Sequence, residues 1–112
     1  MDIDTLEKMI RDGHDSAMLR LTLARLLSVQ GRRQEAVVNL ASAVRQDATY
    51  TAAWKALGQA QLDLGDQQQA ADAWQQGIEV ARQNGDKQAE REMAVFLKRL
   101  RKTDAPSTPS AP

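Results

Sequence analysis

Residues 51–84 read TAAWKALGQAQLDLGDQQQAADAWQQGIEVARQN, and this stretch decides the fold of the 112-residue chain. Trp54, Leu57 and Gly58 stand at the spacing W-x2-L-G, and Ala70 and Trp74 follow at the spacing A-x3-aromatic. Apolar residues recur every three or four positions on both sides of the short LGD segment, which predicts two amphipathic helices joined by a turn. We expect the two tryptophans to pack between these helices.

A second segment, about 17–50, carries the same pattern 34 residues earlier. Three of its residues match three in the later segment: Leu23, Gly31 and Ala36 correspond to Leu57, Gly65 and Ala70. A 34-residue period with these residues resembles the tetratricopeptide repeat. The resemblance implies an all-α fold of antiparallel helix-turn-helix repeats, a TPR-like α-solenoid with about six helices.

The chain departs from the family pattern at five positions. Arg20 stands where the first repeat would have Trp, and Leu27 and Gln61 stand where Tyr is common. Ala48 and Arg82 replace the usual terminal Pro. These departures weaken the match of the first repeat without changing its period.

Shorter amphipathic segments flank the two repeats. A helix over 4–12 is predicted as an N-terminal cap, and a helix over 87–101 as a C-terminal cap. One inserted residue in the turn before the last helix would place Phe96 at the family's Tyr position. Gly77 lies inside a helical pattern, where glycine costs about 1 kcal/mol relative to Ala, and we attribute it to a close approach by the next helix.

These segments give one TPR-like domain over 1–102. The remaining residues, 103–112, are rich in Pro, Ser and Thr, so we expect a disordered tail.

Composition narrows the classes of function. Fifteen basic and fifteen acidic residues give zero net charge, which argues against a nucleic-acid or membrane partner. The chain has no cysteine and a single histidine, His14, and it carries no phosphate loop or catalytic motif. We therefore expect no enzymatic activity, no metal and no cofactor. The acidic N-terminus lacks the features of a signal peptide, so we expect a cytoplasmic protein. The short chain with its Ala/Gln/Arg-rich helices favours a bacterial one.

The resemblance implies a binding surface. In this family the first helices of successive repeats line a concave groove that takes a peptide segment. The positions in this chain that would face the groove include Leu21, Arg25, Lys55, Gln59, Leu62, Lys87 and Arg91.

One subfamily grips chaperone C-termini with a two-carboxylate clamp of Lys, Asn and Arg. Lys87 and Arg91 resemble the last pair of that clamp, but Leu21 and Ala56 stand where it needs Lys and Asn. The chaperone-tail hypothesis is therefore disfavoured. The hypothesis that remains is a groove whose basic residues pair with an acidic segment or a free C-terminus.

Three hypotheses of function follow. The first is a non-catalytic adaptor that binds a protein partner in the groove. The alternative is a structural subunit whose C-terminal helix docks into a homo-oligomer or larger assembly, through apolar residues such as Phe96 and Leu100. A nucleic-acid binder using the basic final helix is the least favoured, because net charge is zero.

Overall fold

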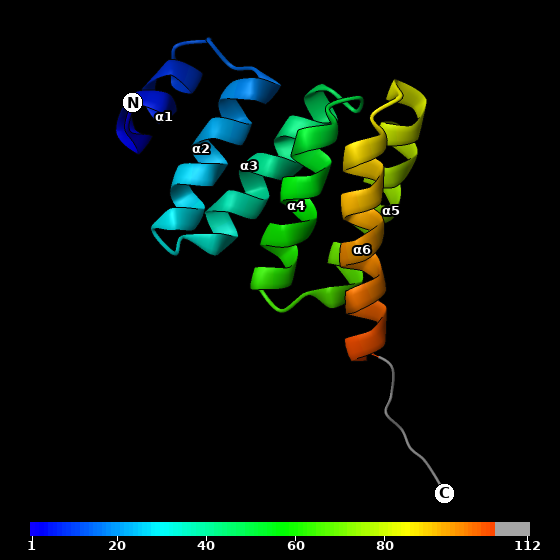
Figure 1. Cartoon of the computed structure of the whole chain (residues 1–112). Helices are drawn as coiled ribbons and strands as arrows, with labels where there is room; N and C mark the ends of the chain where they lie inside the picture. The colour runs from blue at the N-terminus through cyan, green and yellow to red at the C-terminus, as the bar shows by residue number, and fades with distance from the viewer. Residues whose placement is uncertain (105–112) are drawn as a thin grey trace, which may run out of the picture.

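The computed structural model describes residues 1–104, and these residues form six α-helices and no strand. In chain order the helices are α1 (Ile3–Arg11), α2 (Ala17–Val29), α3 (Arg33–Gln46), α4 (Thr51–Asp63), α5 (Gln67–Asn84) and α6 (Lys87–Asp104), as labelled in Figure 1. The all-α prediction is confirmed. Helix α6 runs into the first two residues of the predicted tail, and the rest of that tail, 105–112, lies outside the described residues.

The helices follow the predicted period in the middle of the chain. Helix α2 begins at Ala17 and α4 at Thr51, 34 residues later, and α3 and α5 are spaced in the same way. Helix α6 begins at Lys87, which is 36 residues after the start of α4. The expected insertion of one residue is therefore wrong, and the observed insertion is two residues. Helix α5 has 18 residues where α3 has 14, and the linker after α5 (85–86) is two residues shorter than the linker after α3 (47–50).

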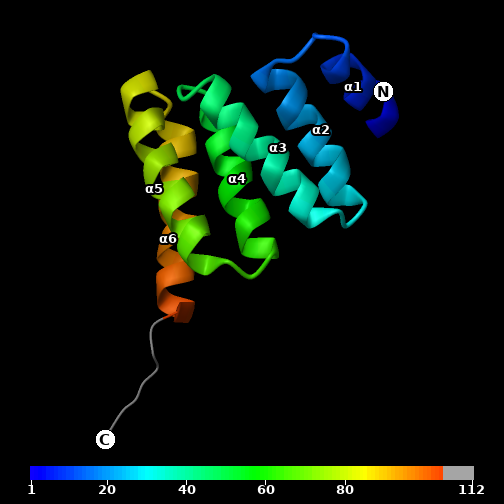
Figure 2. The same cartoon turned by 180° about the vertical axis from the view of Figure 1, so that it is seen from behind.

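The helices form two layers. Helices α2, α4 and α6 follow one another along one face of the molecule, and α3 and α5 lie behind them (Figures 1 and 2). The short α1 packs on α2 at the N-terminal end and buries Ile3 and Leu6. The sequence predicts this helix over 4–12, one residue later at each end than observed.

The turns between paired helices use glycine in the left-handed region. Gly31 has φ of 76° and Gly65 has φ of 87°, and each follows the end of the first helix of its repeat. Residues with a Cβ rarely adopt this conformation, so glycine favours a sharp reversal at both positions. The reversal makes the two helices of each repeat antiparallel.

Trp74 forms the centre of the second repeat. It is 1% exposed, and its indole Nε1 donates a hydrogen bond to the Lys55 carbonyl at 3.1 Å. A Cβ built at Gly58 would overlap the indole ring, so α4 and α5 approach this closely only with glycine there. Trp74 thus packs between the two helices as predicted.

Trp54 and Gly77 form a second close contact. A Cβ at Gly77 would lie 3.0 Å from the Trp54 Cβ and would also press on the Met93 sulfur of α6. The expectation that Gly77 admits the next helix is confirmed. Trp54 itself is half-buried, and its Nε1 donates to the Ala48 carbonyl at 2.9 Å in the linker before α4.

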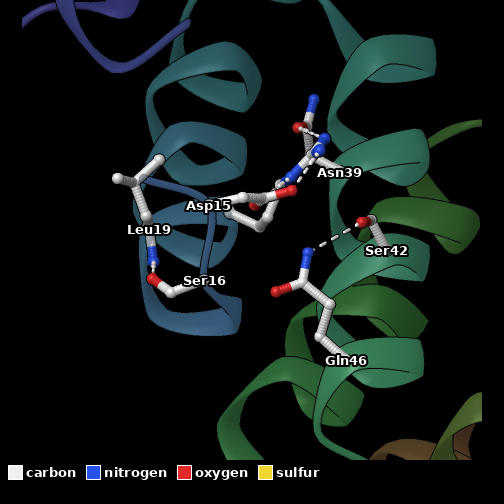
Figure 3. A network of polar contacts seen from close by, with 7 residues as sticks. Asp15, Ser16, Leu19, Asn39, Ser42 and Gln46 are labelled. Carbon is white, nitrogen blue, oxygen red and sulfur yellow. Dashed lines mark hydrogen bonds and ion pairs between the residues drawn. The ribbon is translucent and has the colours of Figure 1, made fainter. Parts of the chain in front are cut away.

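In the first repeat, Arg20 forms a polar network where the family has Trp. Its guanidinium donates two hydrogen bonds of 2.8 Å to the Asp15 carboxylate and one of 3.0 Å to Asn39 Oδ1 on α3. Figure 3 shows Asp15 and Asn39 facing each other across this network. Ser16 caps α2, because its Oγ accepts from the Leu19 N–H at 3.1 Å (Figure 3). The hydrogen bond to Asn39 therefore joins α2 to α3, and the ion pair with Asp15, in the linker before α2, holds the guanidinium in place.

The charge on Arg20 changes the titration of Asp15. Its hydrogen bonds hold the pKa of Asp15 at about 2, below the ordinary 3.8. A carboxyl whose pKa is lower in the folded state stabilises the fold above its unfolded pKa. That contribution is lost as pH falls from about 4 to about 2.

We predict that Gly58→Ala destabilises the protein. The added methyl group must displace the buried Trp74 ring, and overpacking of this kind costs about 1–3 kcal/mol, against which the better helix propensity of Ala returns up to about 1 kcal/mol. Urea denaturation followed by circular dichroism measures the loss. In a Trp74→Leu background the same change should cost less, and an equal cost in both backgrounds would show that the ring is not the obstacle.

We also predict that Asp15→Asn lowers stability at pH 7 by up to about 1 kcal/mol, the upper range for partly exposed ion pairs. Between pH 4 and pH 2 the variant should lose less stability than the wild type, because it lacks the carboxyl that protonates there. Thermal melts across this pH range measure both effects. Asp12→Asn, which removes an exposed ion pair with Lys8, is the matched control. If wild type and Asp15→Asn had the same pH dependence, the Asp15–Arg20 pair would not contribute to the stability of the fold.

Candidate functional site

The three helices of the front layer line a continuous hollow, which we call the concave groove. Its central part is lined by Arg25 of α2, by Ala52, Lys55, Ala56 and Gln59 of α4, and by Phe96 of α6. The adjoining part lies toward the C-terminal ends of α4 and α6 and is lined by Gln59, Leu62, Gln67, Trp74, Phe96, Arg99 and Leu100. Gln59 and Phe96 belong to both parts, so the groove crosses all three helices.

Four of the seven site residues predicted from the sequence line this groove. Arg25, Lys55 and Gln59 lie in its central part, and Leu62 lies in the adjoining part. They come from two helices that start 34 residues apart, so the repeat period alone was enough to bring them together.

Leu21 is a correction to the predicted site. It is 2% exposed and belongs to the same core cluster as Ile3 and Leu6 of α1. The N-terminal cap packs on α2, so this leucine contributes to the core and offers no surface to a partner.

The place of Lys87 and Arg91 on the binding surface stays a prediction. Both side chains are exposed, but neither is among the residues that line either part of the groove. The two-residue insertion before α6 turns a different face of that helix toward α4. Gln88 and Glu92 lie there instead, beside Ala52 and Lys55.

Glu92 changes the charge of the groove. Its Oε1 lies 2.5 Å from Lys55 Nζ, and this hydrogen bond lowers the pKa of Glu92 below the ordinary value. Lys55 is therefore already paired. Sequence reasoning missed Glu92 because its place depends on how α6 is rotated.

Arg25 remains the available cation in the centre of the groove. Its side chain is exposed, and its guanidinium forms no hydrogen bond or ion pair with the described residues. Gln59, across the groove, donates from Nε2 to Asp63 Oδ1 at 3.0 Å. The centre thus combines one unpaired guanidinium with a neutralised Lys–Glu pair.

The second part of the groove contains a cluster of aromatic and apolar side chains. Trp74 and Phe96 have ring centroids 5.3 Å apart and planes tilted by 49°, and Phe96 is only partly buried. Leu62 and Leu100 complete this apolar end. An apolar side chain of a bound segment would find complementary surface here.

Helix α6 exposes little apolar surface, which bears on the alternative hypothesis that this helix docks into an assembly. Met93, Leu97 and Leu100 are buried, and Phe96 packs on Trp74. Val95, at 45% exposure, is the large apolar side chain that α6 leaves exposed within the described residues. A subunit interface through α6 would therefore bury a small patch.

No group of three or more His, Asp or Glu side chains among residues 1–104 is arranged to hold a metal ion. None of the described helices is both long enough and apolar enough to span a bilayer. The concave groove therefore remains the candidate site in this part of the chain.

Comparisons with known proteins agree with the repeat architecture. Residues 14–104 match the family model described as anaphase-promoting complex subunit 5. The chain is 45% identical over 100 residues to TPR repeat-containing protein PA0015 of Pseudomonas aeruginosa, an alignment that covers 89% of this chain and 95% of that protein.

Solved structures give the same result. The solution structure of protein BPP2914 from Bordetella parapertussis superposes with a TM-score of 0.80 and 36% identity, covering 94% of this chain and 91% of that one. The crystal structure of the Sgt2 TPR domain from Aspergillus fumigatus has a TM-score of 0.79 and 25% identity, covering 98% of this chain and 73% of that chain. Together with the 34-residue period and the paired helices, these matches show that the chain belongs to the tetratricopeptide repeat family.

Proposed function

We propose that this chain is a non-catalytic adaptor that binds a segment of a partner protein in the concave groove. Tetratricopeptide repeat proteins are in general protein–protein interaction modules, which supports this class of function. The observation that carries the proposal is the groove itself, because α2, α4 and α6 each contribute side chains to one continuous hollow.

The groove's chemistry suggests what the segment carries. A carboxylate, from an acidic side chain or a free C-terminus, would pair with the Arg25 guanidinium through charge-assisted hydrogen bonds. An apolar side chain farther along would pack between Leu62 and Phe96. The Lys55–Glu92 pair lies between α4 and α6 and adds no net charge, so recognition would depend on few charges.

We predict that Gln59→Trp removes partner binding. Gln59 is exposed and lies where the two parts of the groove meet, so an indole there would fill the path of a bound segment. Gln75→Trp is the matched control, because Gln75 is an exposed position of α5 outside the groove. The measurement is capture of partners from a cell extract, with cross-links identified by mass spectrometry.

The expected result is a partner that cross-links to α2, α4 or α6 of the wild type and the control but is lost from Gln59→Trp. Circular dichroism checks that both variants are folded. If a folded Gln59→Trp chain captures the same partners as the wild type, the groove is not the binding surface.

We predict further that Arg25→Gln weakens binding of a captured partner by about tenfold, the effect of losing one charge-assisted hydrogen-bonded pair. The wild-type affinity should fall as salt is raised, and the variant's affinity should fall less steeply. Fluorescence anisotropy with the cross-linked peptide of the partner measures both. Equal salt dependence in the two proteins would exclude a carboxylate on Arg25.

A further inference from the structure

A second pocket lies between α4 and α5, away from the concave groove. It is lined by Trp54, Leu57 and Gln61 of α4 and by Gln69, Asp72, Ala73 and Gln76 of α5. None of these residues lines either part of the groove. Figure 2, the view from behind, shows the adjacent α4 and α5 from the side of the molecule opposite to Figure 1. We call this site the α4–α5 pocket.

Gln61 places an unpaired acceptor in this pocket. Its Oε1 is buried, and no donor among the described residues reaches it, the one such side-chain atom in this part of the chain. A buried acceptor without a donor is unfavourable, and native structures rarely keep one without a reason. Gln61 also stands where the family pattern commonly has Tyr, so this amide is a departure of the chain itself.

Asp72 gives the pocket its charge. Its Oδ1 accepts a hydrogen bond from Gln68 Nε2 at 3.0 Å, and its Oδ2 accepts none from the described residues. The seven lining residues include this carboxylate and no cationic side chain. The missing complement is therefore a cation that carries hydrogen-bond donors.

Trp54 adds an aromatic wall. The hydrogen bond from its Nε1 to the Ala48 carbonyl fixes the position of the indole, and the side chain remains only half-buried. Aromatic rings attract cations, and guanidinium groups are the commonest partners. The pocket thus combines a carboxylate, an unpaired amide oxygen and an indole.

We propose that the α4–α5 pocket binds the guanidinium of an arginine side chain from a partner protein. A guanidinium carries five donors in a planar fork, so it can pair with Asp72 on α5 while lying against Trp54. A rotation of the Gln61 amide, whose Oε1 is buried in the unliganded chain, would bring that acceptor to the remaining donors. An ammonium group is a compact charge and lacks this planar fork. The site shares no lining residue with the concave groove, so it would give the protein a second contact surface.

The test is a two-dimensional 15N–1H NMR titration of the full chain with N-acetyl-L-arginine amide. We expect saturable shifts of the Trp54 indole N–H and of the Gln61 side-chain amide. The citrulline analogue has the same shape without the charge, and it should bind at least about tenfold more weakly, as expected when a charge-assisted hydrogen bond becomes neutral. The absence of saturable shifts at these two groups, or equal binding of citrulline, would overturn the proposal.

Two variants locate the site. Asp72→Asn changes an exposed residue and keeps its size, so the fold is retained and the arginine affinity should fall at least about tenfold. Gln61→Leu should also weaken binding, and circular dichroism checks its fold. Asp63→Asn is the control, because it removes a carboxylate of α4 that lies outside the pocket. This variant should bind arginine like the wild type. Unchanged affinity in Asp72→Asn would exclude this pocket.

Discussion

The close approach of α4 and α5 around the Trp74 ring is the constraint on which the rest of the second repeat depends. The ring has room because Gly58 has no side chain, and its position is fixed by a hydrogen bond to the Lys55 carbonyl. Phe96 of α6 then packs on the same ring. One buried indole therefore joins the core of the repeat to the apolar end of the concave groove, so the shape of the groove follows from the packing of α5 behind it.

The two repeats solve the same packing problem with different chemistry. The second repeat carries Trp54 in its first helix, and the first repeat carries Arg20 at the matching position. Arg20 reaches Asp15 and Asn39, so a network of hydrogen bonds stands where the family has an aromatic side chain. Such a network is directional and depends on pH, whereas burial of an apolar ring is neither. We therefore expect the first repeat, which contains this network, to be more sensitive to acid than the second.

The rotation of α6 sets the charge of the proposed binding surface. An α-helix turns by 100° per residue, so one residue more or less before α6 presents a different set of side chains to α4. The observed offset of 36 residues places Glu92 beside Lys55, and a groove that would have been basic is left with Arg25 as its unpaired central cation. The α4–α5 pocket has the opposite character, with a carboxylate and an unpaired amide oxygen. The two surfaces would therefore select partners of different charge.

The helices, their antiparallel pairing and the 34-residue period could be predicted from the sequence, because they follow from local apolar spacing and from glycine at the turns. The sequence also placed Arg25, Lys55, Gln59 and Leu62 on the groove, since α2 and α4 are related by one period. Three features could not be predicted from the sequence: Leu21 is buried in the core, Glu92 pairs with Lys55, and Gln61 Oε1 lacks a donor. The physical reason is that these features depend on how helices are rotated against one another. That rotation is set by the length of α5 and the packing of whole helices, and no short stretch of sequence contains it.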